Sequence, residues 1–156
     1  MNIKIEPYVQ DRANEIADLY HASVHAIDED IYTKPEQEAW APTPPNYEAW
    51  VNRLNIKKPF LAVANEKVLG FIELEDDGHI DCAYTHPQYQ KTGIMSALYA
   101  HIEHIAKQKS LKRLWVETSK VARPFFEAKG FVTIQENKVM RNNVILTNYT
   151  MEKILD

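Results

Sequence analysis

The segment HPQYQKTGIMSAL, residues 86–98, joins turn-forming residues to the start of a helical hydrophobic pattern. The first turn of a helix has unpaired backbone N–H groups and a partial positive charge, so it can bind an anion. Gly93 has no Cβ and would let a phosphate approach closely, and Gln90, Thr92 and Ser96 can add side-chain hydrogen bonds. The segment is therefore either an anion-binding site or an ordinary helix start whose glycine permits close packing.

Several classes of phosphate ligand are disfavoured by what the sequence lacks. The segment has neither the Gly-Lys-Ser/Thr of a nucleoside-triphosphate loop nor the three glycines of the dinucleotide fingerprint. The chain has 22 acidic and 18 basic residues, and its lysines and arginines are scattered. We therefore expect a small anionic ligand and no nucleic acid as a partner.

Two histidine pairs have the spacing of zinc ligands on a helix. His21 and His25 are four residues apart, and His101 and His104 are three residues apart. A zinc site needs at least a third protein ligand, and none is evident in the sequence beside either pair. We therefore expect no metal site.

The hydrophobic pattern predicts a single domain, residues 1–156, with the order β-α-α-β-β-β-α-β-α-β-β. Asp11 is the expected N-cap of the first helix. Three central strands form an antiparallel meander, and a strand, helix and strand then join parallel neighbours. The other expected features are turns at residues 65–66 and 76–78, helices from about Asn46 to Leu54 and from Gly93 to about Lys109, a short helix ended by Gly130, and a final hairpin that turns near Asn142-Asn143.

The composition is that of a folded globular chain, with 45% hydrophobic and 26% charged residues. No window approaches the roughly 20 apolar residues of a membrane span, so we expect a cytoplasmic protein with no membrane partner. The single cysteine, Cys82, excludes an internal disulfide. We expect it to be a small buried hydrophobic residue.

Two motifs in succession resemble those of the GCN5-related N-acetyltransferases. Gln90 to Met95 matches the acetyl-CoA signature Gln/Arg-x-x-Gly-x-Gly/Ala except at Met95. Residues 119–131, SKVARPFFEAKGF, match the family segment Asn-x-x-Ala-x-x-Phe-Tyr-x-x-x-Gly-Phe, with Phe126 in place of the tyrosine. The order of elements resembles the whole family fold. The segments YTKPEQEAWAP, ARPFFEAKGF and LTNYTMEK look closest to the YafP-like bacterial branch.

The resemblance implies an α/β (α+β) GNAT fold: a mixed, mostly antiparallel central sheet of about seven strands with flanking helices. The fourth and fifth strands, residues 79–85 and 113–118, would splay apart. The pantetheine arm of acetyl-CoA would fill the gap like an added strand, with the pyrophosphate on the N–H groups of residues 91–96. Cofactor binding is thereby assigned to Ala83, Tyr84, Thr85, Gln90, Lys91, Thr92, Gly93, Ile94, Met95, Ser96, Ser119, Ala122, Phe125 and Phe126.

The implied reaction moves an acetyl group from acetyl-CoA to a primary amine of a small molecule or peptide, by direct attack on the thioester. An amine with a pKa near ~10 is mostly protonated at neutral pH, so a base must take its proton. Asp81 and His79, two residues apart on one strand, are the preferred candidates, and Glu117 is a third. Each is otherwise a polar residue at a strand end that faces water. The backbone N–H of Tyr84 or Thr85 is the expected oxyanion donor.

The tyrosine that usually protonates the departing thiolate in this family is replaced by Phe126 in this chain. Tyr149, Ser119 or water are the candidates to replace it, because a thiol of pKa about 8.5 is easily protonated. Phe125 and Phe126 are expected to pack in the core and against pantetheine. The absence of this tyrosine and the presence of Met95 are two departures from the family motifs. They allow a second class of function, that of a non-catalytic acyl-CoA-binding module.

Acceptor recognition is expected in the first helices and the loop that follows them. Tyr32, Trp40 and Tyr47 would form an aromatic wall beside the acids at positions 28–30, which suits a cationic amine. The competing interpretation is a small core beneath a proline-rich loop. The resemblance also makes a homodimer one expected assembly.

Overall fold

The computed structural model describes residues 1–156 and contains one seven-stranded sheet in the order β1-β2-β3-β4-β5-β7-β6. All neighbouring strands are antiparallel except β4 and β5. The strands are β1 (Lys4–Pro7), β2 (Phe60–Ala64), β3 (Lys67–Leu74), β4 (His79–Thr85), β5 (Arg113–Thr118), β6 (Val132–Arg141) and β7 (Val144–Ile154). The helices are α1 (Ala13–His25), α2 (Lys34–Trp40), α3 (Tyr47–Lys57), α4 (Ile94–Gln108) and α5 (Arg123–Ala128), with short 3-10 turns at Gln10–Arg12 and Pro87–Tyr89.

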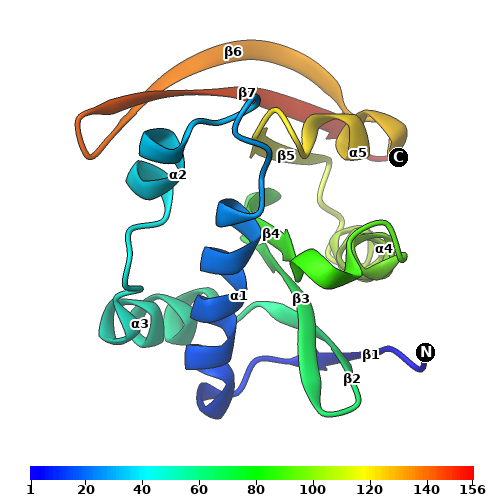
Figure 1. Ribbon diagram of the computed structural model, residues 1–156. Coiled ribbons are helices and arrows are strands. Elements are labelled where there is room, and N and C mark those ends of the chain that lie inside the picture. The colour runs from blue at the N-terminus through cyan, green and yellow to red at the C-terminus, as the bar shows by residue number, and fades with distance from the viewer.

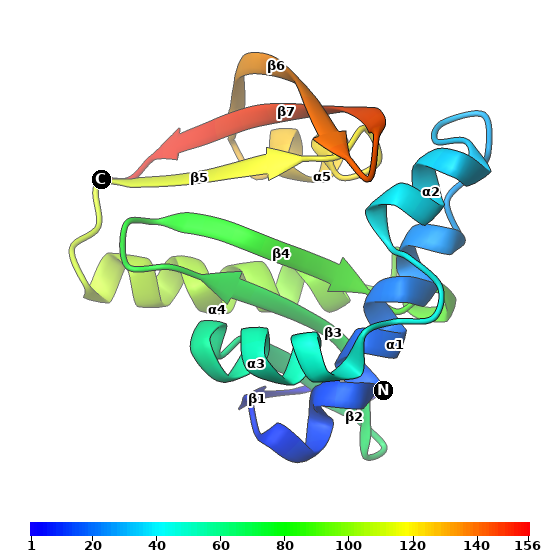
Figure 2. The ribbon, with the colours of Figure 1, turned by 90° about the vertical axis from the view of Figure 1, so that its left-hand side faces the viewer.

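The sheet has a hydrophobic core on each face. Helices α1 and α3 cover one face, and the side chains of Ile16 and Leu54 pack there against Phe71 of β3. Helix α4 covers the other face, where Leu98 and Ile102 are fully buried. Figure 1 shows β3 and β4 between α1 and α4, and Figure 2 shows α3 and α4 on opposite sides of the same strands.

Helix α4 begins very close to the sheet because β3 carries a glycine beneath it. A Cβ at Gly70 would lie 2.8 Å from Cγ2 of Ile94 and 3.0 Å from the carbonyl oxygen of Tyr84. Neither contact leaves room for a side chain. Gly70 therefore lets the N-terminus of α4 approach the end of β4, which sets the position of the loop between them.

Strands β4 and β5 pair only where they begin. Their parallel ladder consists of His79 with Trp115 and Ile80 with Val116. Beyond these pairs the two strands diverge, as Figure 2 shows between the green β4 and the yellow β5. The sheet is therefore split into two parts joined at the start of these strands.

A β-bulge lies in β4 at the point where the strands separate. Ile72 of β3 pairs with Ala83, and Leu74 pairs with Ile80, so one residue of β3 faces two of β4. The extra residue places Asp81 and Cys82 opposite Glu73, and both side chains point to the face covered by α1 and α3. Ile80 and Ala83 pack instead in the core beneath α4.

The splayed mixed sheet and its order of elements confirm the fold expected from the sequence, with two differences. Helix α2 was not predicted, and it begins with a capping box between Thr33 and Glu36. The prediction for Asp11 is wrong, because Asp11 lies inside a 3-10 turn and α1 starts at Ala13 without a side-chain cap. The predicted turn at Asn142-Asn143 is confirmed by positive φ angles at both residues.

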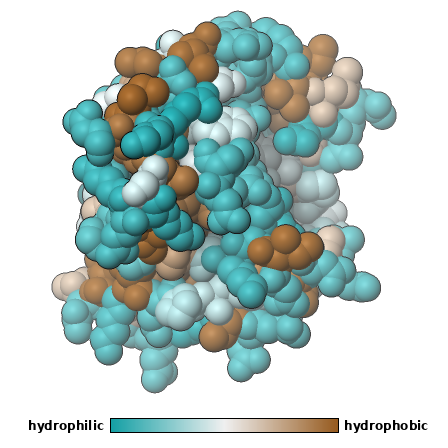
Figure 3. Space-filling model, turned by 180° about the vertical axis from the view of Figure 1, so that it is seen from behind, coloured by the Kyte–Doolittle hydropathy of each residue, from teal (hydrophilic) through white to brown (hydrophobic).

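The outer hairpin β6–β7 carries exposed apolar side chains, among them Val132, Met140 and Ile145. Seen from behind, the surface is mainly hydrophilic, with hydrophobic residues in separate patches (Figure 3). The expected homodimer stays a prediction. None of the helices has the length and apolar character needed to cross a membrane.

Candidate active site

A cavity of about 430 Å³ opens between the diverging strands β4 and β5. Asp81, Cys82 and Ala83 of β4 line one side, and Val116 to Ser119 line the side of β5. The β6–β7 hairpin and helices α1, α2, α3 and α5 close the rest of the wall. The residues of that wall include Tyr20, Tyr32, Trp40, Trp50, Arg53, Ala122, Phe126, Arg141 and Asn148.

The free edge of β4 presents backbone groups to this cavity. The N–H of His86 donates to the carbonyl oxygen of Leu69, which places His86 and Tyr84 among the residues whose backbone faces β3. The intervening residues, Ala83 and Thr85, therefore turn their N–H and C=O groups toward the gap. The carbonyl of Thr85 accepts a hydrogen bond of 2.6 Å from the hydroxyl of Ser23. The backbone N–H groups of Ala83 and Thr85 are therefore free to bond to an extended ligand in the gap.

The loop that leads from β4 into α4 has the geometry of an anion-binding helix start. Gly93 is the N-cap with a φ of 88°, and Lys91 has a φ of 61°. No atom lies within 4 Å of the position that a Cβ of Gly93 would take, so the space in front of the helix is open. Thr92 donates its hydroxyl to the carbonyl of Tyr89, which ties the loop together.

Met95 does not enter that open space. Its side chain packs on the buried residues beneath α4, while its neighbour Ile94 is 1% exposed. Gln90, Lys91 and Thr92 are exposed, and Ser96 is half-buried. The departure from the family signature at Met95 therefore places a partly buried side chain against the core and leaves the start of α4 accessible.

Asp81 is held by two cations at the closed end of the gap. Its carboxylate lies 2.8 Å from Nζ of Lys57 and 3.1 Å from the guanidinium of Arg53. Partial burial opposes the charged form, but Lys57 and Arg53 together hold the pKa of Asp81 below its ordinary value. Asp81 is therefore ionised and a weak base.

A chain of three side chains runs from the cavity through His79. Glu117 lines the cavity, and its Oε1 lies 2.7 Å from Nε2 of His79. Nδ1 of the same ring lies 2.7 Å from Oε1 of Glu75. The imidazole stacks on Trp115 with the ring centroids 4.0 Å apart. His79 itself does not reach the cavity wall, so Glu117 connects it to the site.

A buried ion pair supports the floor of the cavity. Glu73 is 0% exposed and lies 2.6 Å from the guanidinium of Arg53. Burial raises the pKa of Glu73, and the charge of Arg53 opposes that shift. The same guanidinium lies 3.1 Å from Sγ of Cys82, and burial raises the pKa of that thiol. Cys82 is thus the small buried residue that the sequence predicted, and its thiol is protonated.

Aromatic side chains line one side of the cavity, and they include two of the three predicted residues. Tyr32 and Trp40 line the cavity with their rings 5.3 Å apart. The hydroxyl of Tyr32 donates to the carbonyl of Thr147 and accepts from the N–H of Lys120. Trp50 of α3 completes the wall, together with Tyr20 and Tyr84.

Other residues singled out in the sequence lie away from the cavity wall. The hydroxyl of Tyr47 donates to Asp18 on the surface. The acids of positions 28–30 are exposed and do not line the cavity. The ring of Tyr149 lies beneath the guanidinium of Arg123, 4.2 Å from its carbon to the ring centroid, outside the wall.

The segment after β5 brings Ser119, Ala122 and Phe126 to the cavity. Ser119 accepts a hydrogen bond from the N–H of Ala122 and begins the turn into α5. Phe126 is 2% exposed and packs against Phe125 and Phe131. Sequence reasoning missed Trp50, Arg53, Glu73 and Arg141, whose positions depend on contacts between distant elements.

Comparison with known proteins supports the same assignment. Residues 26–153 match the family model described as the acetyltransferase (GNAT) domain. The uncharacterized N-acetyltransferase YafP of Escherichia coli K12 is 27% identical over 150 residues, which cover 96% of this chain and 95% of YafP.

Solved structures share the fold over nearly the whole chain. The crystal structure of a GCN5-related N-acetyltransferase from Rhodopseudomonas palustris has a TM-score of 0.93 and 30% identity, covering 99% of this chain and 97% of that one. The PaiA N-acetyltransferase of Thermoplasma acidophilum, solved in complex with coenzyme A, has a TM-score of 0.78 and 20% identity, covering 99% and 100%. The chain belongs to the GNAT superfamily, in its YafP-like branch, and is an acetyltransferase.

Proposed function

We propose that the protein transfers the acetyl group of acetyl-CoA to a primary amine of a small molecule or peptide, within the cavity between β4 and β5. The observation that carries this proposal is the cavity itself, which joins an unpaired strand edge to the carboxylate of Glu117. The open start of α4 lies at the end of β4 from which a cofactor would enter.

The cofactor would be held mostly by the main chain. Pantetheine amides would bond to the backbone of Ala83 and Thr85 as an added strand does. The pyrophosphate would lie on the N–H groups at the start of α4, where Gly93 leaves space. Phe126, Ala122 and Ser119 would flank the pantetheine arm, because they line the opposite wall.

Glu117 is the proposed acceptor of the amine proton. It reaches the cavity, whereas His79 lies behind it and Asp81 is held by two cations. Its hydrogen bond to His79 orients the carboxylate, and Glu75 fixes the other side of the imidazole. The neutral amine would then attack the thioester carbon, and the C–S bond would break as the tetrahedral intermediate collapses.

The developing oxyanion needs a donor that points into the gap. The N–H groups of Ala83 and Thr85 do so, whereas that of Tyr84 faces β3. Ser119 is the proposed proton donor to the departing thiolate, because Ser119 lines the cavity and Tyr149 does not. Water would return the proton to the hydroxyl of Ser119.

The acceptor is proposed to be cationic before it reacts. Glu117 contributes negative charge at the closed end, and the side chains of Trp40 and Trp50 line the cavity. Aromatic faces and carboxylates attract an ammonium group. Because Arg141 of β6 also lines the cavity, an acceptor that carries a carboxylate as well as an amine would find a partner for each group.

The test is a thiol-release assay with acetyl-CoA and a panel of primary amines, with and without an added carboxylate group. We expect free CoA and an N-acetylated product, identified by mass spectrometry. Tight CoA binding without product from any amine would instead favour the alternative of a non-catalytic acyl-CoA-binding module.

A further inference from the structure

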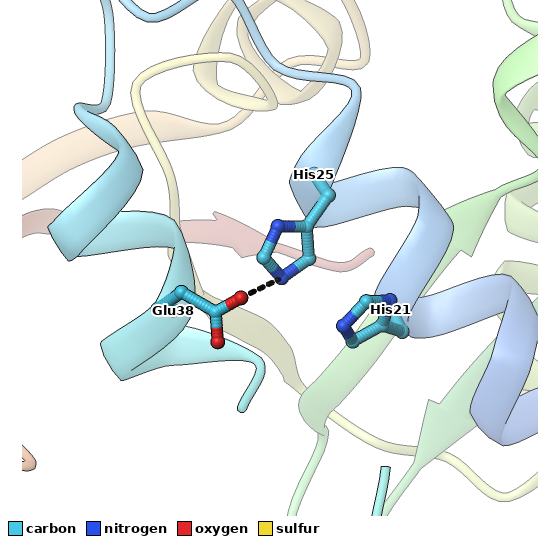
Figure 4. Close-up of side chains that lie close together, drawn as sticks. All are labelled: His21, His25 and Glu38. Atoms are coloured by element: carbon cyan, nitrogen blue, oxygen red, sulfur yellow. Dashed lines mark ion pairs between the residues drawn. The ribbon is translucent and has the colours of Figure 1, made fainter. Parts of the chain in front are cut away.

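His21, His25 and Glu38 meet where α1 faces α2 (Figure 4). The rings of His21 and His25 stack with centroids 4.1 Å apart, since residues four apart lie on one face of a helix. Oε1 of Glu38 lies 3.8 Å from Nε2 of His25. The sequence supplies the histidine pair, and the fold adds a third residue from the helix that the sequence did not reveal.

We propose that His21, His25 and Glu38 bind a zinc-class divalent cation. Two imidazoles and a carboxylate form a common ligand set for zinc, with water in the fourth position. One ligand atom from each residue lies within 4.8 Å of the others. Ligands bonded to tetrahedral zinc at about 2.1 Å are separated by roughly 3.4 Å. Movements of about an ångström by these side chains would bring the donors to that spacing.

Two of the three donor atoms, on His21 and Glu38, contact the same hydroxyl oxygen, and the third, on His25, contacts a backbone carbonyl. Oγ1 of Thr43 lies 2.8 Å from Nε2 of His21 and donates to Oε1 of Glu38 over 2.6 Å. Nε2 of His25 lies 2.8 Å from the carbonyl oxygen of Ala41. A cation would replace these contacts of the three ligands. The side chain of Glu38 is 50% exposed, so water has access to the fourth position.

Charge balance separates this cluster from two others in the molecule. Glu73, Asp81 and Cys82 lie together, as do Glu75, His79 and Asp81. The guanidinium of Arg53 and the ammonium of Lys57 already supply positive charge to those two groups. Glu38 has no lysine or arginine partner; its one ion pair is with His25. The cluster between α1 and α2 is thus the one where a metal cation meets an uncompensated carboxylate.

The site borders the proposed acceptor region without belonging to it. His21 lines a second cavity of about 380 Å³, which also touches Trp40 and Trp50. Glu38 precedes Trp40 by two residues on α2. A bound cation would therefore fix the helix that carries Trp40 to α1. Metal binding itself requires no acetyl transfer and can be measured separately.

The experiment is a calorimetric titration of the untagged, chelator-treated full chain with zinc chloride. We expect one cation per chain, and an affinity lowered by at least about tenfold in both His21→Ala and His25→Ala, because each removes a ligand. His104→Ala is the matched control, since His101 and His104 form the other histidine pair on a helix. It should bind zinc as the unmodified chain does.

Glu38→Gln and Thr43→Val separate ligation from hydrogen bonding. Glu38→Gln should weaken zinc binding, whereas Thr43→Val should retain it, because the valine removes only the competing hydroxyl. Zinc should raise the midpoint of thermal unfolding in the unmodified chain and in Thr43→Val. Absence of zinc binding, or equal binding in the unmodified chain and both histidine variants, would overturn the proposal. Thermal unfolding without zinc checks that each variant is folded.

Discussion

Nε2 of His79 lies 2.7 Å from Oε1 of Glu117, across the two paired positions that join the halves of the sheet. The bond connects strands that separate immediately afterwards. It therefore holds Glu117, the proposed acceptor of the amine proton, at the closed end of the cavity, while Glu75 and Trp115 fix the imidazole on its other sides.

Glu117→Gln should lower kcat/KM for the amine by about 100-fold, because the amide cannot take a proton and general bases contribute about that much. The dissociation constant of CoA should change by less than about twofold. Steady-state kinetics and calorimetry measure the two quantities. Glu152→Gln is the control, since Glu152 pairs with Arg113 outside the cavity. Equal losses in the two variants would contradict the role of Glu117.

Met95→Ala and Gly93→Ala should both lower stability, but only Gly93→Ala should weaken CoA binding. Met95 is partly buried, so its truncation should cost about 1–2 kcal/mol of unfolding free energy, less than the roughly 2–5 kcal/mol for a fully buried methionine. CoA affinity should stay nearly unchanged. Alanine at position 93 must adopt a left-handed conformation that costs about 1–2 kcal/mol and places a methyl group in the anion site.

The pair of variants is compared by urea unfolding and by CoA titration. At least tenfold weaker CoA binding is expected for Gly93→Ala. A large gain in CoA affinity for Met95→Ala would show that the methionine obstructs the loop, contrary to its packing in the core.

Glu103→Gln should reduce stability at neutral pH and lose that effect in acid. Partial burial opposes ionisation, but hydrogen bonds from Tyr99, Lys153 and Lys107 lower the pKa of Glu103 to about 2. A carboxyl group whose pKa is lower in the folded state stabilises the protein at pH values above its unfolded-state pKa, near 4.5. This contribution disappears as the pH falls toward 2.

The measurement is the difference in unfolding free energy between the unmodified chain and Glu103→Gln across that pH range. The difference should shrink steadily from pH 5 to pH 2. A difference that is constant with pH would mean that ionisation of Glu103 does not contribute.

Glu73→Ala should destabilise the fold by about 3 kcal/mol, because it leaves the partly buried Arg53 without its closest partner. Asp81 still compensates part of that charge, so the cost should lie at the lower end of the range for broken buried pairs. Glu136→Ala is the comparison, since Glu136 pairs with Lys138 on the surface and should cost less than about 1 kcal/mol. Chemical denaturation that gave equal costs for the two variants would refute this account.

The cofactor half of the molecule could be predicted from the sequence because its signals are local. Gly93, the turn before it and the helical pattern after it lie within a few residues of one another. The side-chain direction of Met95 also follows from its place in the helix. The two-part motif then indicated the splayed sheet, which the strand order confirms.

The acceptor half depends on contacts that no local pattern encodes. Glu73 has the sequence context of an ordinary strand residue, and only the packing of α3 on the sheet brings Arg53 to it. Helix α2 carried a readable signal, since Thr33 and Glu36 form a capping box and Pro35 suits a first turn. The sequence predictions nevertheless include no helix at residues 34–40. The histidine pair of α1 consequently had no visible third partner.

The extra residue in β4 also sets what kind of sequence change this strand can accept. It lets His79 and Asp81 share a face with Cys82 and Tyr84, although odd and even positions normally alternate. Deleting Asp81 or Cys82 would remove the bulge and restore strict alternation, and the residues on either side would keep their present faces. The bulge is therefore where β4 can lose one residue and keep its two faces, whereas a change of one residue in length elsewhere in the strand would exchange them.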